Sequence, residues 1–241
     1  MRKLIVTLFT VNMTILEKLA PALFLAAVLT SCATPPKPIE LTKDFWERKG
    51  VLGIATATYP KATAYTTGQQ GVLDLLITRS GELPGFIEKM DVATLLSAIP
   101  EDLSTKFRAQ GFEVKQSFKL ETSKFAKFES TPSQRFYADF DFRPVRQTEQ
   151  VDRLLLITVE AIGTTRPYYG FLPTGPPKGM ITWRGELIDL STNELLWRYT
   201  EAQTVPVYDP WDEPPNYPRI VDAVTRAVDS AKRTLEFRLS P

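Results

Sequence analysis

Few residues of this chain could carry out acid–base, nucleophilic or metal chemistry. Its 241 residues include no histidine and a single cysteine, Cys32. A serine–histidine–aspartate or cysteine–histidine site is therefore excluded, and so is a zinc site built on histidine and cysteine. The sequence contains no Walker-type or GxGxxG phosphate loop. We predict that the chain needs no cofactor and holds no metal.

Two carboxylates form the one pair that could act as acid and base. Asp139 and Asp141, in the run FYADFDF, are two residues apart and share one face of an extended segment. A carboxylate-dependent hydrolase would hold both in a deep pocket and raise the pKa of one. A solvated strand face or loop is the simpler interpretation. We therefore predict that the chain is not an enzyme, with an envelope hydrolase as the alternative.

The cysteine lies in a distinctive context. Leu29-Thr30-Ser31-Cys32 directly follows the apolar stretch Leu19–Leu29, with Arg2 and Lys3 near the start. This stretch is shorter than the roughly 20 residues that span a bilayer. The run resembles the lipobox of bacterial lipoprotein signal peptides. The resemblance implies cleavage before Cys32 and acylation of its sulfur, for example with palmitate. An uncleaved anchor and a plain secretory signal are the alternatives, and either Met1 or Met13 fits as the start.

Three regions follow from this interpretation. Residues 1–31 are predicted to be a lipoprotein signal peptide, residues 32–43 a Pro-rich tether, and residues 44–241 a single periplasmic domain. Ala33, where an inner-membrane retention signal would usually show Asp, predicts a lipid anchor on the periplasmic face of the outer membrane. Removing residues 1–31 leaves a formal net charge of about −1. This balance predicts no nucleic-acid partner, and acylation of Cys32 would leave no thiol for a disulfide.

Hydrophobic periodicity places the elements. Apolar residues spaced by three and four predict helices over residues 86–110, interrupted near Pro100, and over residues 217–235. Residues 71–79 fit a helix or a strand, and residues 61–70 are predicted to be a loop. Strands are predicted at residues 50–59, 112–120, 153–163, 179–190 and 194–204. This order predicts an α+β fold, an α/β sandwich whose mixed sheet has a C-terminal antiparallel meander and packs against two or three helices.

Two segments rich in proline and aromatic residues, Thr165–Lys178 and Pro206–Pro218, are predicted to lie outside helices and central strands. The meander would bring both to the end of the sheet opposite the tight turn at residues 191–193. There they would form a partner-binding surface, because aromatic residues and Arg dominate interface hot spots. The candidate residues are Arg166, Tyr168, Tyr169, Phe171, Tyr208 and Trp211.

Other interpretations of these segments stay open. The rings could instead fold back and cap the core, or stack on carbohydrate. Arg166 could bind an anionic group or pair with an acid such as Asp209 or Asp212; the pair is the better interpretation.

The lipobox, the tether, the runs ERKGVLGIA and AQGFEV and the closing strand–strand–helix resemble periplasmic lipoproteins of the curli-channel (CsgG), LpoB and TolB N-terminal type. That resemblance implies a mixed sheet with helices and a role in binding envelope machinery. We expect a non-enzymatic accessory module in envelope assembly, secretion or cell-wall synthesis. The expected partner is an envelope protein, with peptidoglycan or its synthases among the candidates. A subunit of an oligomeric secretion pore is a further alternative, although no pair of membrane-inserting hairpins is evident.

Overall fold

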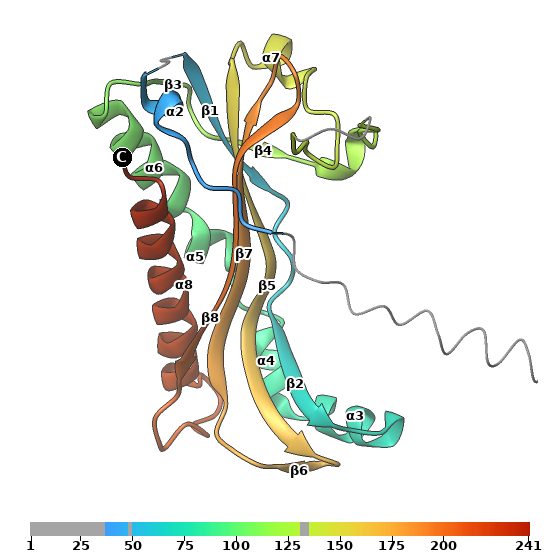
Figure 1. Cartoon of the computed structure of the whole chain (residues 1–241). Helices are drawn as coiled ribbons and strands as arrows, with labels where there is room; N and C mark the ends of the chain where they lie inside the picture. The colour runs from blue at the N-terminus through green and yellow to red at the C-terminus, as the bar shows by residue number, and fades with distance from the viewer. Residues whose placement is uncertain (1–36, 48–49, 131–134) are drawn as a thin grey trace, which may run out of the picture. The chain divides into compact units, whose positions relative to one another are not determined.

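A long antiparallel meander forms the centre of the sheet (Figure 1). It consists of β5 (Arg153–Tyr169), β7 (Lys178–Asp189) and β8 (Glu194–Pro206). Leu155 is paired with Leu187, and Leu187 with Trp197, so apolar side chains of all three strands share one face. The computed structural model describes residues 37–47, 50–130 and 135–241. The predicted meander is confirmed.

Shorter strands add parallel pairs to the other edge of β5. β1 (Val51–Ala57) runs parallel to the first part of β5, with β3 (Glu113–Val114) and β4 (Phe118–Leu120) on its outer side. β2 (Thr63–Gln69) runs parallel to the second part of β5, and β6 (Leu172–Pro173) turns back against its end. The eight strands make one mixed sheet, which confirms the predicted α+β class.

Helices cover one face of this sheet (Figure 1). α8 (Pro218–Arg238) packs against β7 and β8 through a stripe of small and branched side chains, and Gly179 of β7 allows the close approach. The neighbouring helices are α2 (Lys43–Glu47), α4 (Glu82–Ile87), α5 (Val92–Leu96) and α6 (Ala98–Ala109). α3 (Val72–Arg79) extends beyond them without a buried residue. The predicted C-terminal helix is confirmed, and Pro100, near which an interruption was predicted, lies in the first turn of α6.

A second, smaller core lies on the opposite face. Described parts of residues 121–151, including a 3-10 turn (Thr122–Lys124) and α7 (Val145–Thr148), cover one end of the sheet there. Phe142 and Val145 pack against Leu154 and Leu156 of β5. The buried side chain of Asn193 ties this segment to the β7–β8 turn.

Three predicted boundaries were wrong. Residues 61–70 are not a loop but contain β2, a polar edge strand without hydrophobic alternation. Thr165–Tyr169 belong to β5, and Pro167 is tolerated because pairing with β7 ends at Thr165. Residues 112–120 form two short strands rather than one.

The start of the described chain is attached to the edge of the sheet. Ile39 exchanges two backbone hydrogen bonds with Arg198 of β8, of 2.9 and 3.1 Å. The later part of the predicted tether therefore contacts the fold, whereas residues 32–36 lie outside the described residues. Among the described helices, none is long and apolar enough to cross a membrane.

Candidate functional site

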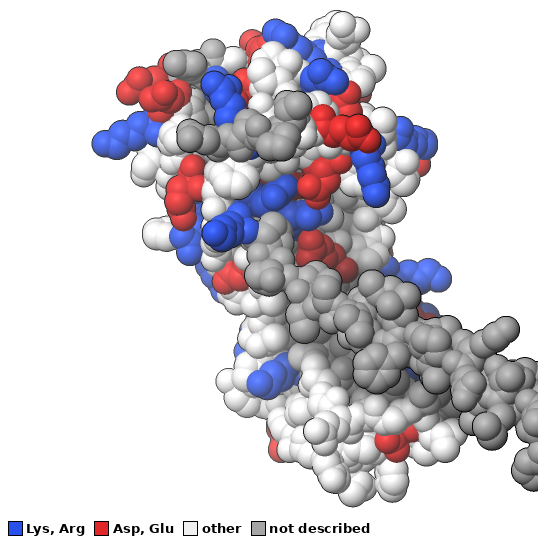
Figure 2. Space-filling view, turned by 45° about the vertical axis from the view of Figure 1, so that its right-hand side comes forward, with Lys and Arg blue, Asp and Glu red and all other residues white. Residues whose placement is uncertain are grey.

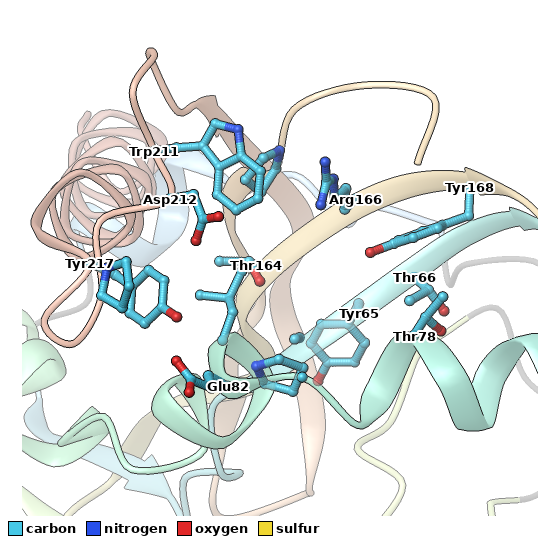
Figure 3. Close-up of a pocket in the computed structure, with 16 residues that line it drawn as sticks. Tyr65, Thr66, Thr78, Glu82, Thr164, Arg166, Tyr168, Trp211, Asp212 and Tyr217 are labelled. Atoms are coloured by element: carbon cyan, nitrogen blue, oxygen red, sulfur yellow. The ribbon is translucent and has the colours of Figure 1, made fainter. Parts of the chain in front are cut away.

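The two proline- and aromatic-rich segments meet at the end of the sheet opposite the turn at residues 191–193. They line a cavity of about 370 Å³ together with residues of β2 and α4 (Figure 3). This volume lies within the range of small-molecule and side-chain pockets. We call it the Arg166 cavity, after the side chain whose contacts join the two segments.

Arg166 is held by aromatic rings. Its guanidinium carbon lies 4.5 Å from the ring centroid of Trp211 and 5.8 Å from that of Tyr168. Its Nε donates a hydrogen bond to the carbonyl oxygen of Gly175, at 3.0 Å. Such contacts with aromatic rings stabilise a partly buried guanidinium.

The predicted acidic partner of Arg166 is not found. Among the described residues, Arg166 forms no ion pair with Asp209 or Asp212. Asp212 does line the cavity, but it lies beside Tyr217 rather than beside the guanidinium (Figure 3). The aromatic faces therefore take the place of the carboxylate that the sequence suggested.

The opposite wall of the cavity is acidic. Burial raises the pKa of the Tyr217 phenol, and the neighbouring carboxylates Glu82 and Asp212 raise it further. Figure 3 shows Tyr217 between these two side chains, with its hydroxyl directed into the cavity. The Tyr217 ring also packs against Phe86, with 5.1 Å between centroids. The cavity thus has a cationic, aromatic wall facing two carboxylates and a neutral phenol.

Contacts with α8 and with Pro177, the residue before β7, hold the loop that carries Trp211. The backbone N–H of Val207 donates to the carbonyl of Pro177, at 3.3 Å. Arg219 of α8 donates to the Asp209 carbonyl and lies 3.5 Å from the Glu213 carboxylate. Together these contacts fix one wall of the cavity without a bound partner.

The structure divides the six predicted surface residues. Arg166, Tyr168 and Trp211 line the cavity. Tyr208 does not line the cavity; it is exposed, and Arg226 of α8 lies over its ring at 5.6 Å. Tyr169 and Phe171 lie beyond the cavity, exposed at the end of β5. Trp211 also packs against the main core, so this one side chain both covers the core and lines the cavity.

Sequence reasoning did not select Tyr65, Glu82 or Tyr217 for this site. Tyr65 was in the supposed loop that is β2, and Tyr217 was assigned only to the apolar stripe of the C-terminal helix. Glu82 begins α4, a helix far from Trp211 in sequence. The only signal in the sequence was that Glu82 is an acidic residue, the type favoured in the first turn of a helix.

Asp139 and Asp141 do not form an acid–base pair of the expected kind. Asp141 accepts two hydrogen bonds of 2.8 Å from the Arg143 guanidinium, which lowers the pKa of its carboxyl. Asp139 is exposed and lies 3.8 Å from Arg198. Neither lines the Arg166 cavity. Within the described residues, no group of three or more potential ligands could hold a metal.

The predicted signal peptide and Cys32 lie outside the described residues, so lipidation of Cys32 remains a prediction.

Neither protein-family models nor the sequences of curated proteins match this chain. Solved structures with partial similarity exist. Protein XCC0632 from Xanthomonas campestris is 12% identical, with 83% of this chain and 90% of that chain covered, at a TM-score of 0.38.

Two further similar structures come from other bacteria. Lipoprotein GNA1162 from Neisseria meningitidis is 13% identical, covering 74% of this chain and 99% of that chain, at a TM-score of 0.26. The LpoB C-terminal domain from Salmonella enterica is 10% identical, covering 64% and 81%, at a TM-score of 0.18. At these identities and TM-scores, none of the three assigns a function to this chain.

Proposed function

We propose that this chain is an envelope lipoprotein that acts as a non-enzymatic binding module. Acylated Cys32 would anchor it in the periplasmic face of the outer membrane, and the Arg166 cavity would receive a segment of an envelope protein. The observation that carries the proposal is the stacking of Arg166 between Trp211 and Tyr168 at the cavity wall. It places a cation and two rings, the residue types that dominate binding hot spots, at one preformed site.

The chemistry of the two cavity walls indicates which chemical groups the partner segment would carry. The Nε of Arg166 donates to the Gly175 carbonyl, and neither of its two Nη nitrogens donates a hydrogen bond to another described residue. These nitrogens suit a carboxylate or carbonyl of the partner. Glu82 and Asp212 suit an amide or ammonium group on the opposite side. A short peptide segment with groups of both kinds fits this arrangement.

We also propose that the residues of the cavity and the pair Asp139 and Asp141 are not catalytic. Arg143 stabilises the ionised form of Asp141, opposite to what a general acid requires. In the cavity, the raised pKa of Tyr217 keeps its phenol protonated at neutral pH, so it acts as a hydrogen-bond donor rather than a base. Binding therefore accounts for these residues more simply than hydrolysis does.

In-cell crosslinking tests this function. A photoreactive amino acid at position 168 would face the cavity, and the same amino acid at Thr192 would lie in the turn at the other end of the sheet. We expect one envelope protein to crosslink from position 168, to be lost with Arg166→Ala, and to be absent from position 192. Arg143→Ala is the matched control, because this Arg also stacks on a ring, that of Phe128 at 5.2 Å, away from the cavity.

Equal crosslinking from both positions, or a partner that persists in a folded Arg166→Ala variant, would contradict a role for the cavity. Loss of membrane attachment in Cys32→Ser tests the anchor separately. A chain that stays membrane-bound without Cys32 would contradict the lipoprotein assignment.

A further inference from the structure

Seven large apolar side chains are exposed together beyond the cavity. They come from α3, from the end of β5, from the start of β6 and from the turn between these two strands, and each is between 55% and 77% exposed. We call this surface the apolar tip; it consists of Val72, Leu73, Leu76, Ile77, Tyr169, Phe171 and Leu172. The two segments are neighbours, because Gln70 Nε2 donates to the Gly170 carbonyl at 3.0 Å and the Gly170 N–H donates to Gln69 at 2.8 Å.

The apolar tip carries almost no charge. Residues 68–80 and 168–176 include two charged side chains, Asp74 and Arg79. The Asp74 carboxylate is turned back to accept from the Gly71 N–H, at 2.8 Å. In the face shown by Figure 2, charged side chains gather over the upper part and few lie at the lower end, where Figure 1 places α3 and β6. Among these residues an acidic partner would meet only Arg79, and a basic partner only Asp74.

We propose that the apolar tip inserts into the interfacial region of the bilayer that holds the lipid of Cys32. An apolar helix face with an adjacent Tyr and Phe is typical of segments that lie in a membrane interface. This inference rests on the proposed anchor, which would keep the tip close to a bilayer, so that even weak insertion occurs at high effective concentration.

The length of chain before Ile39 sets the geometry. Cys32 and Ile39 are seven residue steps apart along the chain, which span at most about 25 Å. Ile39 is bonded to Arg198 of β8, and β8 continues for eight more residues to Pro206. Pro206 is level with Thr165 of β5, because both pair with Lys178, and β5 continues for four more residues to Tyr169. Twelve residues of strand cover about 40 Å. The tip and the anchor can therefore share one bilayer only if the strands incline by more than about 50° from the membrane normal.

Site-specific fluorescence on the full acylated chain tests the insertion. Because acylated Cys32 has no free thiol, Phe171→Cys introduces the only one, and an environment-sensitive dye can be attached there. Thr192→Cys is the matched control at the opposite end of the sheet. In neutral phosphatidylcholine vesicles containing nitroxide-labelled lipids, we expect quenching at position 171 about tenfold stronger than at position 192. Leu73→Asp combined with Leu76→Asp should abolish the difference, and both positions are exposed enough for the fold to survive.

Equal quenching at the two positions of a chain that floats with the vesicles would overturn the inference while leaving the anchor intact. A second outcome is that the dye at position 171 is shielded from water without lipid and the chain sediments as a dimer. The tip would then contact a second copy of the chain, and the inference would also be overturned. Failure of the wild-type chain to float would overturn the anchor, and with it this inference.

Discussion

The guanidinium carbon of Arg166 lies over the indole ring of Trp211, 4.5 Å from the ring centroid. One residue belongs to the central strand β5 and the other to the loop before α8, so this contact joins the two segments at the cavity. A partly buried cation–π pair contributes about 0.5–2 kcal/mol. The contact can therefore position the loop, but it does not hold the fold together.

A double-mutant cycle measures this coupling. We expect Arg166→Met and Trp211→Leu, combined, to destabilise the chain by about 0.5–1 kcal/mol less than the sum of the single variants. Arg166→Met combined with Trp46→Leu, in α2, is the control and should be additive. Urea unfolding monitored by circular dichroism gives the free energies of unfolding. Additivity in the first pair would mean that the stacking contributes nothing.

The Tyr217 phenol should report the charge of the cavity wall. Because burial raises its pKa most, and Glu82 and Asp212 add to the rise, Glu82→Gln with Asp212→Asn should lower the pKa but leave it above that of free tyrosine. The measurement is phenolate absorbance during alkaline titration, with Tyr217→Phe subtracted to isolate this residue. An unchanged pKa in the double variant would show that the two carboxylates do not act on the phenol.

Asn193 is expected to be the most sensitive residue of the β7–β8 turn. It has a φ of 67°, its amide donates to the carbonyls of Ala138 and Phe140, and its carbonyl oxygen accepts from the Phe142 N–H. Asn193→Ala strains the turn and leaves these buried groups unpaired, at a cost of about 2–4 kcal/mol.

Asn193→Gly separates the two causes, because glycine keeps the positive φ but loses the hydrogen bonds. It should lower the urea midpoint by less than Asn193→Ala does. If the two variants are equally unstable, backbone strain plays no part in the effect.

The sequence predicted those elements whose hydrophobic pattern repeats along one face. β7 and β8 alternate, and α8 has a stripe at helical spacing, so all three were placed correctly. β2 was missed because an edge strand of Thr, Tyr, Gly and Gln buries little and therefore shows no alternation. Its polar composition is typical of loops as well.

The site was predictable as far as chain connectivity determines it. The meander alone brings Arg166 and Trp211 to the same end of the sheet. Chain connectivity could not show that β5 extends beyond β7, because the length over which two strands pair depends on tertiary contacts. This extension separates Tyr169 from the cavity. Nor could connectivity place Glu82 opposite Arg166, since α4 reaches that wall only through packing of the helical layer.

Gly179 should tolerate no side chain. A Cβ there would overlap the backbone of Ala223 and Val224 in α8, so Gly179→Ala must push the helix off the sheet. We expect a loss of about 1–3 kcal/mol, the usual cost of overpacking. Gly85→Ala in α4 is the control, because its Cβ meets no atom within 4 Å. Thermal unfolding should show Gly85→Ala unchanged or slightly more stable; equal melting temperatures for both variants would contradict the close approach of α8.

The ion pair between α6 and α8 should stabilise the fold in a pH-dependent way. Lys232 Nζ lies 2.6 Å from Asp102 Oδ2, and this hydrogen bond raises the pKa of Lys232 above its usual 10.5. A raised pKa in the folded state means that the stabilisation is complete below about pH 10.5 and is lost as the pH rises through the folded-state pKa. Because both side chains are partly exposed, Asp102→Asn should cost at most about 1 kcal/mol at neutral pH.

The difference in stability between wild type and Asp102→Asn should therefore shrink in strongly alkaline solution, as measured by urea unfolding across a pH series. Glu121→Gln removes the far more exposed pair with Lys124 and should change little at any pH, because solvent screens that pair. A difference for Asp102→Asn that stays constant from neutral to strongly alkaline pH would show that Asp102 acts through packing of α6 rather than through the charge of Lys232.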